Sequence, residues 1–169
     1  MMPNQRQQSA KPELARTGDT AVSPHNIAMN LLARREHSLV ELKNKLLARD
    51  IPPDEADEVV ASLAARDLVS DERFTDAFVR VRMRKGQGPV RIRQELRQRG
   101  VSSDVIDASL ETLAAEWVGL AGEVRRKKFG LTAPPDFKAK ARQMRFLEYR
   151  GFTTEQIMAA FETLSSDND

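Results

Sequence analysis

The sequence predicts an all-α protein whose helices form three tandem three-helix repeats arranged as an elongated, curved array. The first observation is an anchor that occurs three times, at Arg49–Ile51, Arg99–Val101 and Arg150–Phe152, with spacings of 50 and 51 residues. The second is that apolar residues follow each anchor at the same offsets of five, nine and twelve. They are Ala56, Val60 and Leu63; Ile106, Leu110 and Leu113; and Ile157, Phe161 and Leu164. Repetition at such a period is typical of tandem helical units that bury apolar faces against their neighbours.

Composition supports small helical units over one compact globule. The 169 residues are 40% hydrophobic, but only 5% are aromatic and 31% are charged. We therefore expect a polar N-terminal arm at 1–22 without structure, followed by repeats at 23–69, 70–115 and 116–165.

The first repeat has clear helix-start signals. Ser23 and Pro24 are expected to begin its first helix, and Ser38 with Glu41 forms a capping-box pattern at the start of the second. Pro52 and Pro53 separate the second helix from the third.

The second repeat opens with a helix capped by Ser70. Its predicted buried stripe is Phe74, Ala77, Phe78 and Val81. The segment 85–101 then predicts a loop, a helix starting at Pro89, and a stop at Gly100.

The third repeat aligns less well with the other two. Its first helix ends in the basic run 125–128, where cations favour the helix dipole, and Pro134 and Pro135 form a rigid loop. Asp136 caps the next helix, whose apolar seam is predicted to be Phe137, Ala141, Met144 and Leu147.

Composition also restricts the cellular setting. The chain has no cysteine, which excludes disulfides, thiol nucleophiles and thiolate metal sites and suits a reducing compartment. Residues 1–19 are polar, unlike a signal peptide, and no apolar run is long enough to span a bilayer. We expect a cytoplasmic protein without a membrane partner.

The residues that could perform catalysis have simpler explanations. The acids at 54–58 lie in the first turn of a helix, where capping and the dipole account for them, and the acids at 71–76 have the same explanation. His25 and His37 are isolated, and surface placement or capping explains them. The turn Gly86–Gly88 lacks the strand and the Gly-Lys-Ser/Thr ending of a phosphate-binding loop. We expect no catalytic residue, metal, cofactor or small-molecule substrate.

Basic residues concentrate in two blocks. Residues 71–100 carry nine Lys and Arg against four Asp and Glu, and residues 116–150 carry the same numbers. At helical spacing they form three predicted rows, Arg73/Arg80/Arg84, Arg93/Arg97 and Lys138/Arg142/Arg145, the last beside Tyr149, which could stack on a base. Such rows can neutralise phosphates or an acidic protein surface, or they are ordinary solvated faces. The candidate contact residues are Arg80, Arg84, Lys85, Arg91, Arg93, Arg97, Lys127, Lys128, Lys138, Arg142 and Arg145.

A set of residues in each repeat carries a family signature. Its central part comprises Arg73-Phe74, Phe78, Arg82, Lys85–Pro89, Ile92, Glu95-Leu96 and Gly100-Val101. The first repeat adds Arg35, His37-Ser38, Glu41-Leu42 and Leu46; the third adds Trp117, Leu120-Ala121, Phe129-Gly130, Arg145–Leu147 and Tyr149–Phe152. With these residues the chain resembles the RecX family of bacterial recombination regulators over residues 24–164. Asp50 stands where the other two repeats have glycine, which would allow its helix to end differently.

The resemblance implies a non-enzymatic modulator that binds the RecA–DNA filament and inhibits RecA ATPase, strand exchange and LexA co-protease activity. It implies a role in recombinational DNA repair and the SOS response, with single- or double-stranded DNA contacted directly or within the filament. Two alternatives stay open: an autonomous DNA-binding regulator with helix-turn-helix-like units, and a metal-dependent nuclease.

Overall fold

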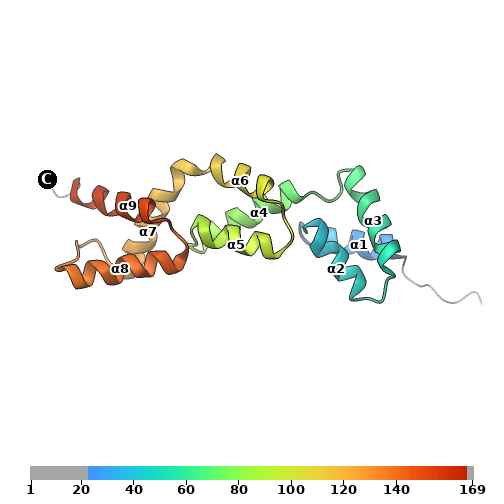
Figure 1. Cartoon of the computed structure of the whole chain (residues 1–169), viewed down its shortest axis with the longest axis horizontal. Helices are drawn as coiled ribbons and strands as arrows, with labels where there is room; N and C mark the ends of the chain where they lie inside the picture. The colour runs from blue at the N-terminus through green and yellow to red at the C-terminus, as the bar shows by residue number, and fades with distance from the viewer. Residues whose placement is uncertain (1–22, 167–169) are drawn as a thin grey trace, which may run out of the picture.

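The computed structural model describes residues 23–166, and that part of the chain is entirely helical (Figure 1). The predicted arm at 1–22 lies outside the described residues. The elements are α1 (Pro24–Leu32), α2 (Leu39–Leu47), α3 (Pro53–Ala65), α4 (Asp71–Arg84), α5 (Pro89–Gln98), α6 (Ser103–Thr112), a 3-10 turn η1 (Ala114–Glu116), α7 (Trp117–Phe129), α8 (Phe137–Arg150) and α9 (Thr154–Ser166). No described helix combines the length and apolarity needed to cross a membrane.

Most helix starts follow the predicted caps. The side chains of Ser23, Ser38, Ser70 and Asp136 each accept a hydrogen bond from the backbone N–H three residues later. The reciprocal half of the predicted capping box is wrong, because the Glu41 carboxylate accepts hydrogen bonds of 3.1 and 2.6 Å from the Arg35 guanidinium instead.

Each repeat buries its own hydrophobic core, as three short helices around one apolar seam require. The first core is centred on Leu42, Leu46 and Leu63, the second on Ile92, Leu96 and Ile106, and the third on Ala121, Leu147, Ile157 and Phe161. Trp117, at the start of the third repeat, packs into the second core. The fold is therefore three tandem three-helix units, drawn out along one axis as an elongated array (Figure 1).

The predicted buried stripe of α4 is only partly correct. Phe74 is buried, but Val81 is 39% exposed and Ala77 is also exposed, while Thr75 and Val79 are fully buried. The reason is that α4 packs against α6, which buries a face rotated from the predicted one. Ala77, Phe78 and Val81 instead line a groove beside the first repeat.

The predicted seam of α8 is wrong at its first position. Phe137 is 85% exposed, whereas Leu147 is fully buried and Ala141 and Met144 are partly buried. Gln143, which the pattern left out, is buried because its side chain accepts a hydrogen bond from Arg125 at 2.8 Å.

The middle helices of the three repeats meet end to end. The backbone N–H of Gly88, which caps α5, donates to Arg150 O at the end of α8 (2.8 Å), and Val90 N–H donates to Gly151 O (2.9 Å). At the other junction the Ser38 hydroxyl, which caps α2, donates to Arg99 O at the end of α5 (2.7 Å). Figure 1 shows α8, α5 and α2 following one another along the same side of the array. We call the contact between α2 and α5 the first joint, and the contact between α5 and α8 the second joint.

The three anchors end their helices in the same way. Asp50 has φ of 60°, close to the values of 77° at Gly100 and 95° at Gly151. The different helix end that Asp50 would allow is therefore not found. Gly100 and Gly151 each pack against the neighbouring repeat, where a Cβ atom would collide. The end of α2 meets no further repeat, so a side chain is tolerated at Asp50.

Candidate partner-binding surface

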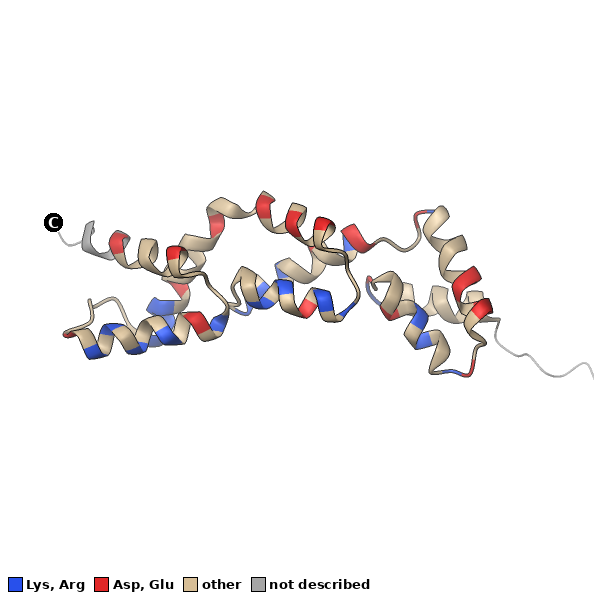
Figure 2. Cartoon of the chain, in the orientation of Figure 1, with Lys and Arg blue, Asp and Glu red and all other residues tan. Residues whose placement is uncertain are grey.

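Opposite charges lie on opposite edges of the array. Helix α8 carries five Lys and Arg against one Glu, and α5 carries three Arg against one Glu. In contrast, α3 carries four acids and α6 carries three, without any base. Figure 2 shows blue residues gathered on α5 and α8 along one edge and red residues on α6 and α9 along the other, while the red residues of α3 lie at the right-hand end of the array.

Four of the sequence-predicted cations come together in a groove at the second joint. Arg84 and Lys85 reach it from the end of α4, and Lys127 and Lys128 reach it from the last turn of α7. The groove has a volume of about 710 Å³. Its remaining lining residues are Met83, Gly86, Leu120, Glu123, Val124, Phe146 and Arg150. We call it the cationic groove.

The sequence explains why these cations can lie so close together. All four occupy the C-terminal ends of α4 and α7, where the helix dipole favours positive charge. Arg150 is fixed by donating to Lys85 O at 3.1 Å. Glu123 is the one acid among the lining residues, so the groove has a strong excess of positive charge.

The arginines of α5 divide into paired and unpaired groups. Arg93 forms an ion pair with Asp107 of α6, and Arg91 pairs with Glu95 at 3.2 Å. Arg97 is exposed and has no ion pair within residues 23–166. The predicted Arg93/Arg97 row is therefore split, with Arg93 turned toward α6.

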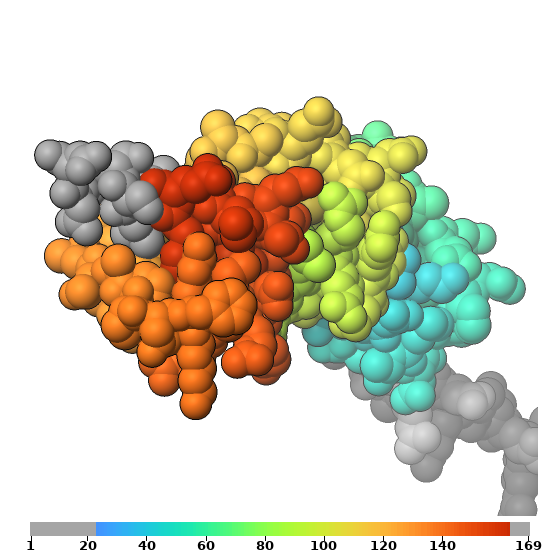
Figure 3. All heavy atoms as spheres, turned by 60° about the vertical axis from the view of Figure 1, so that its left-hand side comes forward, coloured from blue at the N-terminus to red at the C-terminus, as the bar shows by residue number. Residues whose placement is uncertain are grey.

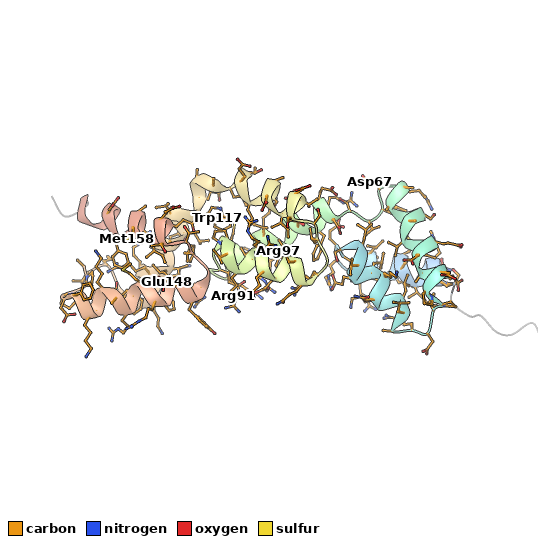
Figure 4. All side chains as sticks on the ribbon, viewed as in Figure 1. Asp67, Arg91, Arg97, Trp117, Glu148 and Met158 are labelled. Atoms are coloured by element: carbon orange, nitrogen blue, oxygen red, sulfur yellow. The ribbon has the colours of Figure 1, made fainter. Side chains whose placement is uncertain are left out.

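The row on α8 is exposed. Lys138, Arg142 and Arg145 share one face with Tyr149, which is 77% exposed. Figure 3 shows side chains of this helix, in orange, standing out from the surface of the third repeat. The Arg91 guanidinium lies 5.9 Å from the Tyr149 ring centroid, and Arg91 and Glu148 line one shallow depression at the second joint (Figure 4).

The predicted row on α4 is wrong at Arg73. Its guanidinium forms ion pairs with Glu36 (3.1 Å) and Asp67 (2.7 Å), and so fastens α4 to the first repeat. Arg80 is exposed and makes no ion pair in the described part of the chain.

Sequence reasoning missed the role of Arg125. This residue belongs to the basic run, yet it is 0% exposed and donates to Gln143 Oε1 (2.8 Å), Gly130 O (3.2 Å) and Thr132 O (2.7 Å). Burial lowers the pKa of its guanidinium. The apolar pattern carries no signal for this burial, because Val79, the equivalent and fully buried residue 46 positions earlier, is also absent from the predicted stripe.

His37 is buried, so the surface placement predicted for it is wrong. It is 2% exposed, and its Nδ1 lies 2.9 Å from Arg35 O, which selects the tautomer that carries the proton on Nδ1. Burial, and then the nearby Arg35 charge, lower the pKa of His37. Within residues 23–166, no three His, Cys, Asp or Glu residues are grouped as metal ligands would be.

These features define an all-helical repeat protein with one basic edge and a cationic groove between two repeats. Models of the RecX family match all three units: the first three-helix domain at residues 25–63, the second at 70–110 and the third at 116–161. The chain belongs to the RecX family.

Similar proteins of known name are regulatory proteins. The chain is 42% identical over 156 residues to "Regulatory protein RecX" of Halorhodospira halophila, covering 92% of this chain and 97% of that one. It is 43% identical to the protein of the same name from Pseudomonas entomophila, covering 82% and 90% of the two chains. We conclude that it is a member of a family of regulatory proteins.

Solved structures share the fold. The crystal structure of RecX from Lactobacillus salivarius superposes with a TM-score of 0.70 at 22% identity, covering 84% of this chain and 94% of that one. A second structure, described as regulatory protein RecX, gives a TM-score of 0.71 at 21% identity, covering 85% and 70%.

Proposed function

We propose that this protein is a non-enzymatic regulator that binds the RecA–DNA filament and inhibits the ATPase, strand-exchange and co-protease activities of RecA. Through these activities it modulates recombinational repair and the SOS response in the cytoplasm. Membership of the RecX family supports the regulatory role, and the surface described above supports a large anionic partner.

The observation that carries the proposal is the number of exposed cations without ion pairs on two successive repeats of an elongated array. Nine of the eleven candidate residues, all except Arg91 and Arg93, form no ion pair within the described residues. They occupy α4, α5, α7 and α8, which belong to two successive repeats. A filament offers the same anionic feature repeatedly, so an elongated array can bind it at several points, and multivalent contact raises the affinity without any single strong site.

The direct test measures RecA ATPase on single-stranded DNA while this protein is added well below the RecA concentration. We expect inhibition at that ratio, because one array contacts several protomers or blocks growth at a filament end. An absence of inhibition even at equal concentrations would contradict the proposal. A requirement for equal concentrations would indicate simple sequestration of RecA.

A pair of matched variants sharpens the test. Arg97→Glu changes an unpaired, exposed arginine, and we expect about a tenfold loss of inhibitory potency. Arg93→Glu changes an arginine already neutralised by Asp107, so we expect a smaller loss. Equal potency of the wild-type protein and Arg97→Glu would remove α5 from the contact surface.

The main rival is an autonomous DNA-binding regulator. It would use the same basic edge but would prefer one DNA sequence, so a competition titration between unrelated duplexes distinguishes it. A nuclease would cleave DNA in a divalent-metal-dependent manner, which an assay with purified protein would detect.

A further inference from the structure

The two joints contain equivalent grooves. Five residues of α7 line the cationic groove, and the five residues 46 positions earlier on α4 line a groove at the first joint, from Phe74 (matching Leu120) to Arg82 (matching Lys128). Arg99 occupies the position of Arg150, 51 residues earlier, and Arg35 that of Lys85, 50 residues earlier. The same scaffold therefore presents two grooves one repeat apart.

Each cation of the groove at the first joint is held by a neighbouring group: Arg35 and Arg82 by carboxylates, and Arg99 by the backbone O of Glu95, to which it donates at 2.8 Å. The groove has a volume of about 300 Å³, and Ala77, Phe78 and Val81 provide apolar surface. Arg35 is paired with Glu41 at 2.6 Å, and Arg82 with Glu95 at 2.7 Å. The faces of the Phe78 ring are also occupied, because Arg82 and Arg99 lie 4.5 and 4.7 Å from its centroid.

In the cationic groove, by contrast, three lysines are free to bind a ligand. Lys85, Lys127 and Lys128 are exposed and make no ion pair in the part of the chain that the structure describes. Below them Met83, Leu120 and Val124 form an aliphatic floor. A ligand that fits this arrangement has negative charge at the rim and an apolar group that reaches the floor.

The floor is poorly suited to a nucleobase. The one aromatic ring that lines the groove, Phe146, is already covered by Arg150, 5.1 Å from its centroid, and packs edge-on against Phe129 at 5.3 Å. Stacking on a base needs an accessible aromatic ring, and Tyr149 on the outer face of α8 is 77% exposed although Arg91 lies 5.9 Å from its centroid, whereas the groove has no such ring. Carboxylates with a neighbouring aliphatic side chain fit the groove better.

We propose that the cationic groove binds an acidic segment of a protein partner, which inserts an apolar side chain against Leu120 and Val124 while its carboxylates pair with Lys127 and Lys128. The outer face of α8, with Lys138, Arg142 and Tyr149, is left for the nucleic acid. The proposal rests on the proposed function for the identity of the partner, and it assigns the protein and nucleic-acid contacts to different surfaces.

The first experiment uses two fluorescein-labelled peptides of about twelve residues, rich in Asp and Glu, with either leucine or serine at the centre. We expect the leucine peptide to bind the full-length protein about tenfold more tightly, because the groove floor buries the side chain. Lys127→Glu/Lys128→Glu should weaken that binding at least about tenfold, whereas Lys138→Glu/Arg142→Glu, with the same change of charge, should alter it less than about twofold.

The same variants are then measured with a fluorescein-labelled single-stranded oligonucleotide, and we expect the opposite order. Circular dichroism checks that both variants keep the helical content of the wild type. Three results would each overturn the proposal. The two variants could have equal effects on both probes, the two peptides could bind equally, or Lys127→Glu/Lys128→Glu could weaken oligonucleotide binding more than Lys138→Glu/Arg142→Glu does.

A photocrosslink tests the assignment with the natural partners. Replacing Glu123, an exposed residue of the groove, by p-benzoylphenylalanine should give an adduct with RecA when the protein is irradiated on RecA-coated single-stranded DNA. The same replacement at Tyr149 should label the DNA. A DNA adduct from position 123 would overturn the proposal. Failure of the proposed function can be told apart from failure of this inference. In the first case the wild-type protein would not inhibit RecA, but the leucine peptide would still bind more tightly than the serine peptide.

Discussion

The first and second joints differ in what holds the repeats together, although equivalent helices meet at both: α2 with α5 at the first, and α5 with α8 at the second. At the first joint side chains make the contact: Ser38 donates to Arg99 O, and Asp71 accepts from Leu39 N–H at 2.9 Å. At the second joint backbone meets backbone through Gly88, Val90 and Gly151. A contact between backbones allows little adjustment, so the second joint should be the more rigid, and it carries the cationic groove.

The difference extends to the chemistry of the grooves. Val81 and Arg82 at the first joint correspond to Lys127 and Lys128 at the second. The lining of the first groove has three Arg against two Glu, whereas that of the cationic groove has five Lys and Arg against one Glu, so side-chain differences at a few positions give the second groove a larger excess of positive charge. A repeat protein can in this way use one scaffold for two kinds of contact.

The largest expected effect comes from adding a methyl group at the second joint. Gly151 has φ of 95°, and a Cβ there would lie 2.4 Å from Arg91 Cβ and 2.7 Å from Arg91 N. Because the backbone of α5 cannot move aside, Gly151→Ala should lower the free energy of unfolding by about 3 kcal/mol. Urea denaturation followed by circular dichroism measures the change.

Gly119→Ala is the matched control, since a Cβ on that helical residue of α7 would meet nothing within 4 Å. It should be neutral or stabilise the protein by up to about 1 kcal/mol. If Gly151→Ala proves as harmless as Gly119→Ala, the backbone contact at the second joint is not a rigid one.

The corresponding substitution at the first joint should destabilise the protein less, and a second substitution should partly restore its stability. Gly100 has φ of 77°, and a Cβ would lie 2.5 Å from Val40 Cγ2, which is a side-chain atom. Gly100→Ala should therefore lower the free energy of unfolding by about 2 kcal/mol, and adding Val40→Ala should restore part of it. A double-mutant cycle by urea denaturation provides the measurement. Additive effects of the two changes would show that Val40 does not limit the space at this joint.

A third comparison concerns the buried position that differs between the second and third repeats. Arg125→Leu makes the third repeat resemble the second, which has Val79 there, but it leaves Gly130 O and Thr132 O without their donor. We expect a loss of about 1 to 2 kcal/mol and faster amide exchange around residues 130–136, because removing one partner leaves polar groups unsatisfied. Unchanged exchange in that loop would show that Arg125 does not hold it.

The smallest expected effect is a pH dependence located at the first joint. The folded state lowers the pKa of His37, so the unfolded state binds more protons as the pH falls through about 6.5, and stability should decrease there. His37→Gln introduces the residue found at the equivalent position of the second joint, Gln87, and should flatten the profile between about pH 5.5 and 8. Thermal unfolding at several pH values tests this. Burial raises the pKa of Asp71 at the same joint, whereas for Glu41 burial acts in the raising direction but is outweighed by the hydrogen bond and charge of Arg35, which lower its pKa.

Persistence of the wild-type slope in His37→Gln would assign the pH dependence to another group.

Local physics accounts for what could be predicted from the sequence. Helix starts at Ser23, Ser38, Ser70 and Pro89 follow from capping chemistry, which depends on residues a few positions apart. The 50-residue period is visible because the same apolar spacing recurs after each anchor. Which face of α4 is buried could not be predicted, because Ala77 and Val81 have the right spacing, but once α4 packs against α6 it is Thr75 and Val79 that are buried.

The candidate partner-binding surface likewise has features that the sequence predicts and features that only the packing determines. The sequence determined which cations this protein has and that they recur at helical spacing, because charge and periodicity are properties of the chain itself. Only the tertiary structure decided that Arg93 is neutralised by Asp107, that Arg125 is buried, and that Arg84, Lys85, Lys127 and Lys128 meet in one groove. The physical reason is that ion pairs, burial and grooves depend on distances between helices that are far apart along the chain, and packing alone sets those distances.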